Sequence, residues 1–121
     1  MLLAGNYRCV QPDRPRSIAE AVHSDIEKSR QVYEWVGAVC RKLGASNTDL
    51  VPFEKYAAAA RGLVKPSSAA RALFAGARNI ERVDLLVQGI ARQQGMHCDD
   101  LDEIVGFVNK RLQMNRSAAA K

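Results

Sequence analysis

Hydrophobic residues recur three and four positions apart along most of the chain, and this spacing is typical of amphipathic helices. One long apolar stripe begins at Ile18. Ser17 and Glu20 form a capping box around its first turn, in which each side chain satisfies a free backbone N–H. Gly44 follows the stripe and is a typical left-handed helix end. The pattern therefore predicts a single long helix over residues 17–44.

Four further helices are predicted from the same spacing and from the polar residues at their starts. At the start of each predicted helix, a side chain can accept a hydrogen bond from a backbone N–H group. Prolines or glycines follow the ends of several of these helices. The predicted ranges are 49–64, 67–76, 79–95 and 99–112, and the expected caps are Asp49, Ser67 or Ser68, Asn79 and Asp99.

The remaining segments complete a single all-α domain. Residues 1–10 could form a short helix, and the two prolines within residues 11–16 predict a loop. Alternating runs of β-branched residues, which would predict strands, do not occur. We therefore expect one domain of five to six helices over residues 1–116, followed by a flexible tail at 117–121.

Length and composition limit the class of protein. The 121 residues suit one domain, and a hydrophobic content of 47% is ordinary for a globular protein. The chain has no run of about 18 or more apolar residues, so we expect no membrane span. Its N-terminus becomes polar too soon for a signal peptide, which favours a cytoplasmic protein. Cys9, Cys40 and Cys98 lack disulfide or zinc-site spacing, so reduced thiols are expected.

Neither the net charge nor the adjacent pair His97 and Cys98 indicates a specific ligand. The net charge of +5 favours anionic partners in general. Glu81 and Asp84 are interleaved with the basic residues of 71–92, so a mixed-charge surface is expected there rather than a nucleic-acid interface. His97 and Cys98 are adjacent but lack the recurring spacing of zinc ligands, which favours a structural turn and no metal site.

The second half of the chain contains an ordered set of short motifs. A Ser-Ser pair at 67–68 precedes a helix that ends in Ala-Gly at 75–76, and a later helix ends in Ala-Arg-Gln-Gln-Gly at 91–95. A polar turn and a final amphipathic helix follow. This order resembles the C-terminal helical domain of the ketopantoate reductases (2-dehydropantoate 2-reductases), a fold like that of the 6-phosphogluconate dehydrogenase C-terminal domains. The turn lacks the proline that is usual in that family.

The resemblance implies substrate-binding roles for Ser67 and Ser68, of which Ser68 matches the substrate-binding serine of the family. A hydroxyl at a helix start lies beside free N–H groups that can hold a carboxylate, although capping is the commonest task of such serines. Asn6 lies one position away from an asparagine of the family's first helix, and it is a further substrate-binding candidate.

The resemblance places the catalytic glutamate of the family at one of two positions. An ungapped alignment from the 91–95 motif puts it on Asn79, which can hydrogen-bond a substrate but cannot transfer a proton. A shifted alignment puts it on Glu81. Glu81 is therefore the catalytic candidate, and Asn79 is a candidate for substrate binding.

Two parts of the family's chemistry have no counterpart in the sequence. Met1 stands where the family has the lysine that protonates the alkoxide as hydride arrives. A GxGxxG nucleotide fingerprint after a strand does not occur. The resemblance therefore implies that the chain binds no cofactor alone, that NADPH requires a separately supplied nucleotide-binding domain, and that the isolated chain is inactive.

Two hypotheses about function follow. In the first, the chain is the substrate-binding and dimerisation half of an NADPH-dependent 2-oxo acid (ketopantoate) reductase, and its partners are a 2-oxo acid and a nucleotide-binding domain. In the second, it is a helical protein–protein interaction module that self-associates as a homodimer through exposed apolar surface.

Overall fold

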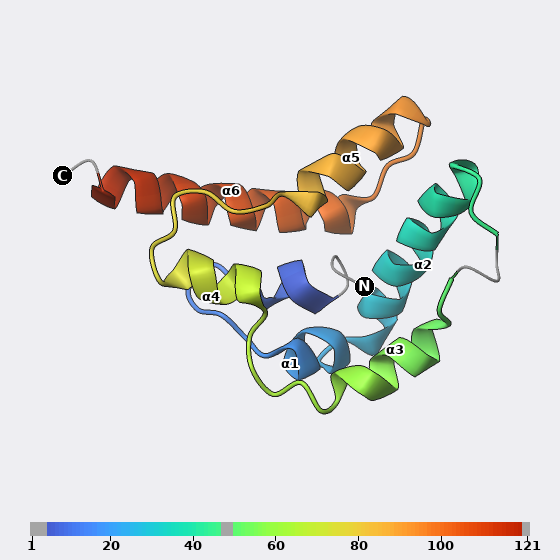
Figure 1. Ribbon diagram of the computed structural model, residues 1–121, viewed down its shortest axis with the longest axis horizontal. Helices are drawn as coiled ribbons and strands as arrows, with labels where there is room; N and C mark the ends of the chain where they lie inside the picture. Colours follow the sequence, from blue (N-terminus) through green and yellow to red (C-terminus); the bar gives the residue numbers. More distant parts are fainter. Residues whose placement is uncertain (1–4, 47–49, 120–121) are drawn as a thin grey trace.

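The computed structural model describes residues 5–46 and 50–119, and these residues are all-α (Figure 1). No strand occurs in the described part of the chain; one isolated bridge joins Val10 to Pro15. The helices are the short 3₁₀-helix η2 (Tyr7–Cys9) and the α-helices α1 (Ile18–His23), α2 (Ile26–Lys42), α3 (Phe53–Ala60), α4 (Ser68–Phe74), α5 (Val83–Gln93) and α6 (Asp99–Ala119). The predicted all-α class is confirmed.

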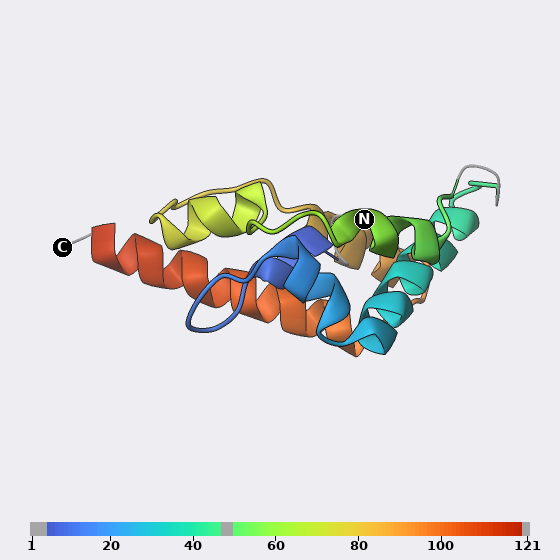
Figure 2. The same cartoon turned by 90° about the horizontal axis from the view of Figure 1, so that it is seen from below.

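The long α6 and the α1–α3 group form two sides of the molecule, and η2 lies between them (Figure 1). η2 contacts α1, α4 and α6. Figure 2 shows α4 alongside the C-terminal half of α6. There the Nδ2 of Asn115 donates to the backbone carbonyls of Leu73 and Ala77, at 2.8 Å each, and so ties the end of α4 to α6.

One apolar core joins all these elements. Its aromatic part is formed by Tyr33, Phe53 and Tyr56, whose ring centroids lie 5.2–6.5 Å apart. The most deeply buried aliphatic side chains come from η2, α1, α2, α4 and α6, and they include Val10, Val22, Val32, Leu73, Leu101 and Val108. No helix among residues 5–46 and 50–119 is long and apolar enough to cross a membrane.

The prediction of a single helix over residues 17–44 is wrong, because Ser24 and Asp25 interrupt the helix and separate α1 from α2. Asp25 leaves helical geometry with φ −145° and ψ 86°, and its carboxylate accepts the N–H of Lys28 at 3.1 Å. A second helix therefore starts there with its own cap. Ser29 stabilises the corner by donating its hydroxyl to the carbonyl of Val22 at 2.7 Å.

Both outer ends of that predicted helix are confirmed. The Ser17 hydroxyl accepts the N–H of Glu20 at 3.1 Å, as a helix cap does. Gly44 has φ 104°, the left-handed geometry that a glycine permits at a helix end. The local signals at the ends were therefore sufficient, and the break between them was not visible in the hydrophobic stripe.

Asn79 does not cap the fifth helix, which begins at Val83 with Arg82 as the residue before it. The Tyr7 hydroxyl explains this later start. It donates to the carbonyl of Glu81 at 2.5 Å and accepts the N–H of Val83 at 3.1 Å, so it satisfies one of the free N–H groups at the start of α5. The tertiary contact therefore replaces the predicted cap.

Two other boundaries differ from the predictions. α3 ends at Ala60, four residues before 64, because the carbonyls of Leu63 and Lys65 accept the N–H groups of Ala19 and Ile18 at the start of α1. Asp49, the expected cap of α3, lies outside the described residues, and Pro52 precedes the helix instead. Asp99, the expected cap of α6, is its first helical residue.

The C-terminal helix is longer than the pattern predicts. α6 ends at Ala119, beyond the predicted end at 112 and into the segment 117–121 expected to form a tail. The acidic side chains of its first turn suit the positive end of the helix dipole.

Candidate functional site

Two neighbouring hollows share Asn6 and Ser68 in their walls. The first, here the Glu81 pocket, has a volume of about 400 Å³ and is lined by Asn6, Tyr7, Ser68, Ala69, Ala72, Ile80, Glu81 and Val83. The second, here the Lys65 pocket, has a volume of about 360 Å³ and is lined by Asn6, Ile18, Gly62, Leu63, Val64, Lys65, Pro66, Ser67, Ser68 and Arg71. Four of the five predicted site residues therefore line one or both of these pockets.

The two serines have different surroundings. Ser67 is 3% exposed, accepts the N–H of Ala70 at 3.2 Å and donates to the carbonyl of Asn6 at 2.6 Å. Its hydroxyl is thus occupied as a cap and as a tie to η2. Ser68 is exposed, is the first residue of α4, and has no side-chain hydrogen bond to another described residue. Of the pair, Ser68 has the hydroxyl that is available to a ligand.

The two candidates for the glutamate position lie in different places. Glu81 is exposed and lines the Glu81 pocket. Asn79 lines neither pocket, and its Oδ1 accepts a hydrogen bond from Arg116 at 3.2 Å. The geometry therefore favours Glu81 over Asn79 as the residue that faces a ligand.

Tyr7 is a pocket residue that the sequence patterns did not indicate. It is 4% exposed, and burial raises the pKa of its phenol, with smaller contributions from Asp84 and Glu81. Its hydroxyl already bridges the backbone of Glu81 and Val83. Tyr7 therefore fixes the wall that carries Glu81, and only a tertiary contact reveals this role.

The two pockets differ in charge. Lys65 and Arg71 line the Lys65 pocket, which has no acidic residue in its wall. Glu81 is the charged residue of the Glu81 pocket, whose other walls are largely apolar. Asn6 and Ser68 lie where the basic and the acidic compartments meet.

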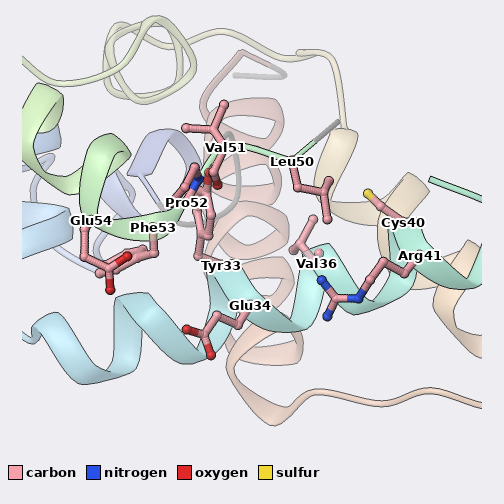
Figure 3. A pocket seen from close by; sticks show the side chains of 11 residues that line it. Tyr33, Glu34, Val36, Cys40, Arg41, Leu50, Val51, Pro52, Phe53 and Glu54 are labelled. Carbon is pink, nitrogen blue, oxygen red and sulfur yellow. The ribbon is translucent and has the colours of Figure 1, made fainter. Parts of the chain in front are cut away.

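A third hollow of about 380 Å³ lies between α2 and residues 50–54 (Figure 3). Val36 and Leu50 point toward one another across it, while Arg41 lies at one end and Glu34 toward the other. The Tyr33 hydroxyl in its wall donates to the carbonyl of Val51 at 2.6 Å. None of the predicted site residues lines this hollow, and its polar groups do not converge on one point.

His97 lies at the turn before α6, as the sequence predicts. Its Nε2 lies 2.6 Å from an Oδ of Asp102 and 3.6 Å from an Oδ of Asp99, and all three side chains are exposed. The hydrogen bonds from His97 and from Gln88 lower the pKa of Asp102. The contact is a hydrogen bond at the surface that holds the turn.

Comparisons of the chain with models of protein families, with curated proteins and with solved structures gave no match. What defines the chain is its own geometry: an all-α domain with a largely apolar pocket between η2, α4 and the segment before α5, in which Glu81 is the charged residue.

Proposed function

We propose that the chain is the substrate-binding helical half of a two-part NADPH-dependent 2-oxo acid reductase, and that the Glu81 pocket holds the acid. One observation carries the proposal: Asn6, Ser68 and Glu81, which are far apart in sequence, line the same pocket. Their selection as candidates came from the sequence resemblance alone. Their convergence in space is what a shared ligand requires.

The pocket offers suitable chemistry for such a ligand. The Ser68 hydroxyl and the Asn6 side chain can donate hydrogen bonds to a carbonyl oxygen. The Glu81 carboxylate can accept a hydrogen bond from a hydroxyl group. The apolar walls formed by Ile80 and Val83 suit a short aliphatic body.

Turnover requires groups that the described residues do not supply. NADPH would supply the hydride, and it would have to be held by another domain, because none of the described residues forms the strand–turn–helix that binds a dinucleotide. The resemblance puts the catalytic lysine at the position of Met1, which lies outside the described residues and whose thioether side chain has no acidic proton. The Tyr7 hydroxyl is already bound to backbone groups. The chain is therefore a substrate-binding domain that is catalytically inactive by itself.

Chemical-shift perturbation on the isotopically labelled chain tests the proposal. Titration with ketopantoate should shift the amides of Asn6, Ser68 and Glu81. Ser68→Ala and Glu81→Gln should each weaken binding of the acid. Asn79→Ala is the matched control, since Asn79 lies outside the pocket. Absence of shifts at millimolar acid would contradict the proposal.

A second candidate function is self-association, which the exposed apolar side chains favour. Leu86 is 60% exposed on α5, and Val64 is 74% exposed in the loop after α3. Such side chains would favour a partner surface where they gather into one patch. Sedimentation equilibrium should then show a dimer that Leu86→Glu or Val64→Glu dissociates, and a monomer at high concentration would contradict this function.

A further inference from the structure

The Lys65 pocket has two cationic side chains for which the described residues provide no partner. Neither Lys65 nor Arg71 forms an ion pair or a side-chain hydrogen bond with another described residue. The sequence contains no acidic residue between Glu54 and Glu81, so the local chain supplies no countercharge. The pocket therefore has an uncompensated positive charge beside a polar floor.

The helix geometry places this charge next to the proposed substrate pocket. Residues 68 and 71 are three positions apart on α4 and thus neighbours on its surface, and both line the Lys65 pocket. Residues 68 and 72 are four positions apart, and both line the Glu81 pocket. Ser68 therefore lies on the border, where one small ligand can reach both compartments.

We propose that the Lys65 pocket binds the carboxylate of the 2-oxo acid, with Arg71 and Lys65 as its counterions, and so fixes the orientation of the ligand. This inference rests on the proposed function. The negative charge of Glu81 disfavours a carboxylate in the Glu81 pocket, whereas Arg71 can bind one through paired N–H groups. Arg71 and Lys65 are thus specificity-determining residues.

If the carboxylate binds in the Lys65 pocket, the positions of the keto oxygen and the aliphatic body follow. The carbonyl carbon of a 2-oxo acid is bonded directly to its carboxyl carbon. A carboxylate beside Arg71 therefore brings the keto oxygen to the border residues, Asn6 and Ser68. The aliphatic body then extends into the Glu81 pocket, against Ile80 and Val83. The site takes an acid with an anionic head and a short apolar body.

Binding of 2-oxoisovalerate to labelled protein, followed by amide shifts, tests this assignment. Arg71→Gln should raise the Kd roughly tenfold, because a charged hydrogen bond is lost, and Lys65→Gln should raise it several-fold. Arg61→Gln is the matched control: it removes the same charge at the end of α3, but Arg61 lines neither pocket. It should change the Kd less than twofold.

A neutral ligand separates carboxylate binding from general effects of charge. The amide of 2-oxoisovalerate lacks the anionic head, so Arg71→Gln should leave its affinity unchanged. Equal weakening by Arg71→Gln and Arg61→Gln, or no weakening by Arg71→Gln, would overturn the assignment and leave the proposed function intact.

Inorganic phosphate keeps the two proposals distinguishable. If 2-oxoisovalerate shifts none of Asn6, Ser68 and Glu81, the proposed function fails. Phosphate should even then shift residues 62–68 and 71, and Arg71→Gln should abolish those shifts. No phosphate shifts in that region would overturn the anion pocket as well.

Discussion

Arg8 and Asp84 are both buried charged residues, yet their surroundings differ. Asp84 is fully buried, and both of its carboxylate oxygens accept hydrogen bonds from Arg82, at 3.0 and 2.8 Å. Arg82 also donates to Asn109 at 2.8 Å and so connects the start of α5 to α6. Arg8 is 6% exposed, and its guanidinium donates to the Ser29 hydroxyl without an ion pair to any described carboxylate.

The difference shows that a buried charge can be held by a charged partner, as Asp84 is, or by a neutral hydrogen-bond partner, as Arg8 is. When a guanidinium donates two hydrogen bonds to a buried carboxylate, these bonds offset much of the free energy lost when the carboxylate leaves water. Removal of either group leaves the other charge without a partner. A buried charge with one neutral partner recovers less. Burial accordingly lowers the pKa of Arg8 from its usual value, and the positive charge of Arg16 lowers it further.

The largest expected effect is that of Asp84→Ala. It leaves the half-buried Arg82 guanidinium without its counterion, which should lower the free energy of unfolding by about 3–5 kcal/mol. Urea unfolding followed by far-UV circular dichroism measures this. Asp99→Ala is the control, because Asp99 is also in the first turn of a helix but its side chain is 96% exposed. Equal losses of stability in the two variants would contradict the conclusion that the buried pair with Arg82 makes Asp84 important for stability.

Ser29→Ala should have the next largest effect. It removes the hydroxyl acceptor of Arg8 and the donor to the carbonyl of Val22, so we expect a loss of about 1–3 kcal/mol in the free energy of unfolding. Ser24→Ala removes an exposed hydroxyl at the same corner, which accepts from Arg16, and should cost much less. A negligible cost of Ser29→Ala would show that the corner does not depend on this bond.

Arg8→Met should change stability least among the buried substitutions. An apolar side chain of similar length avoids the cost of burying an unpaired charge, so the free energy of unfolding should stay within about 1 kcal/mol or increase. In the Arg8→Met background, Ser29→Ala should cost less than it does alone. A large loss of stability in Arg8→Met would show that Arg8 is as well compensated as Asp84.

The smallest expected effect is a shift in the titration of Tyr56. Burial, with smaller effects of Cys9 and Tyr33, raises the pKa of Tyr56 from 10.0 to about 12, and the charge of Arg8 opposes this rise. The folded state therefore holds the proton while the unfolded state loses it, and stability falls as pH rises from 10 toward 12. Ultraviolet titration should find a midpoint near 12 in the natural chain and a higher one in Arg8→Met.

The helix pattern predicted the fold class and several helix ends correctly, because these depend on residues close in sequence. Ser17 and Ser67 cap helices with their own hydroxyls, and Gly76 and Gly95 have positive φ at helix ends. The start of α5 and the end of α3 were placed wrongly. In both cases the backbone groups that decide the boundary bond to distant segments, through Tyr7 and through the start of α1.

The candidate site was predicted in part. Ser68, Asn6 and Glu81 were selected by resemblance and lie around one pocket, while Asn79 lies outside it. Tyr7, Lys65 and Arg71 were not selected. Lysine, arginine and tyrosine are common residues, so they acquire a role only when the packing of α4 against η2 forms the two pockets that they line.

The sequence alone determined that the chain forms helices, and where several of them begin or end, since these are local properties of spacing and backbone hydrogen bonds. The tertiary structure decided that the long stripe breaks at Asp25, that η2 lies at the centre, and that two pockets share Asn6 and Ser68. The position of η2 and the shared pockets depend on contacts between residues that are far apart in sequence. The break at Asp25 depends on hydrogen bonds of Asp25 and Ser29 to nearby backbone groups. A hydrophobic pattern that repeats every three or four residues encodes none of these features.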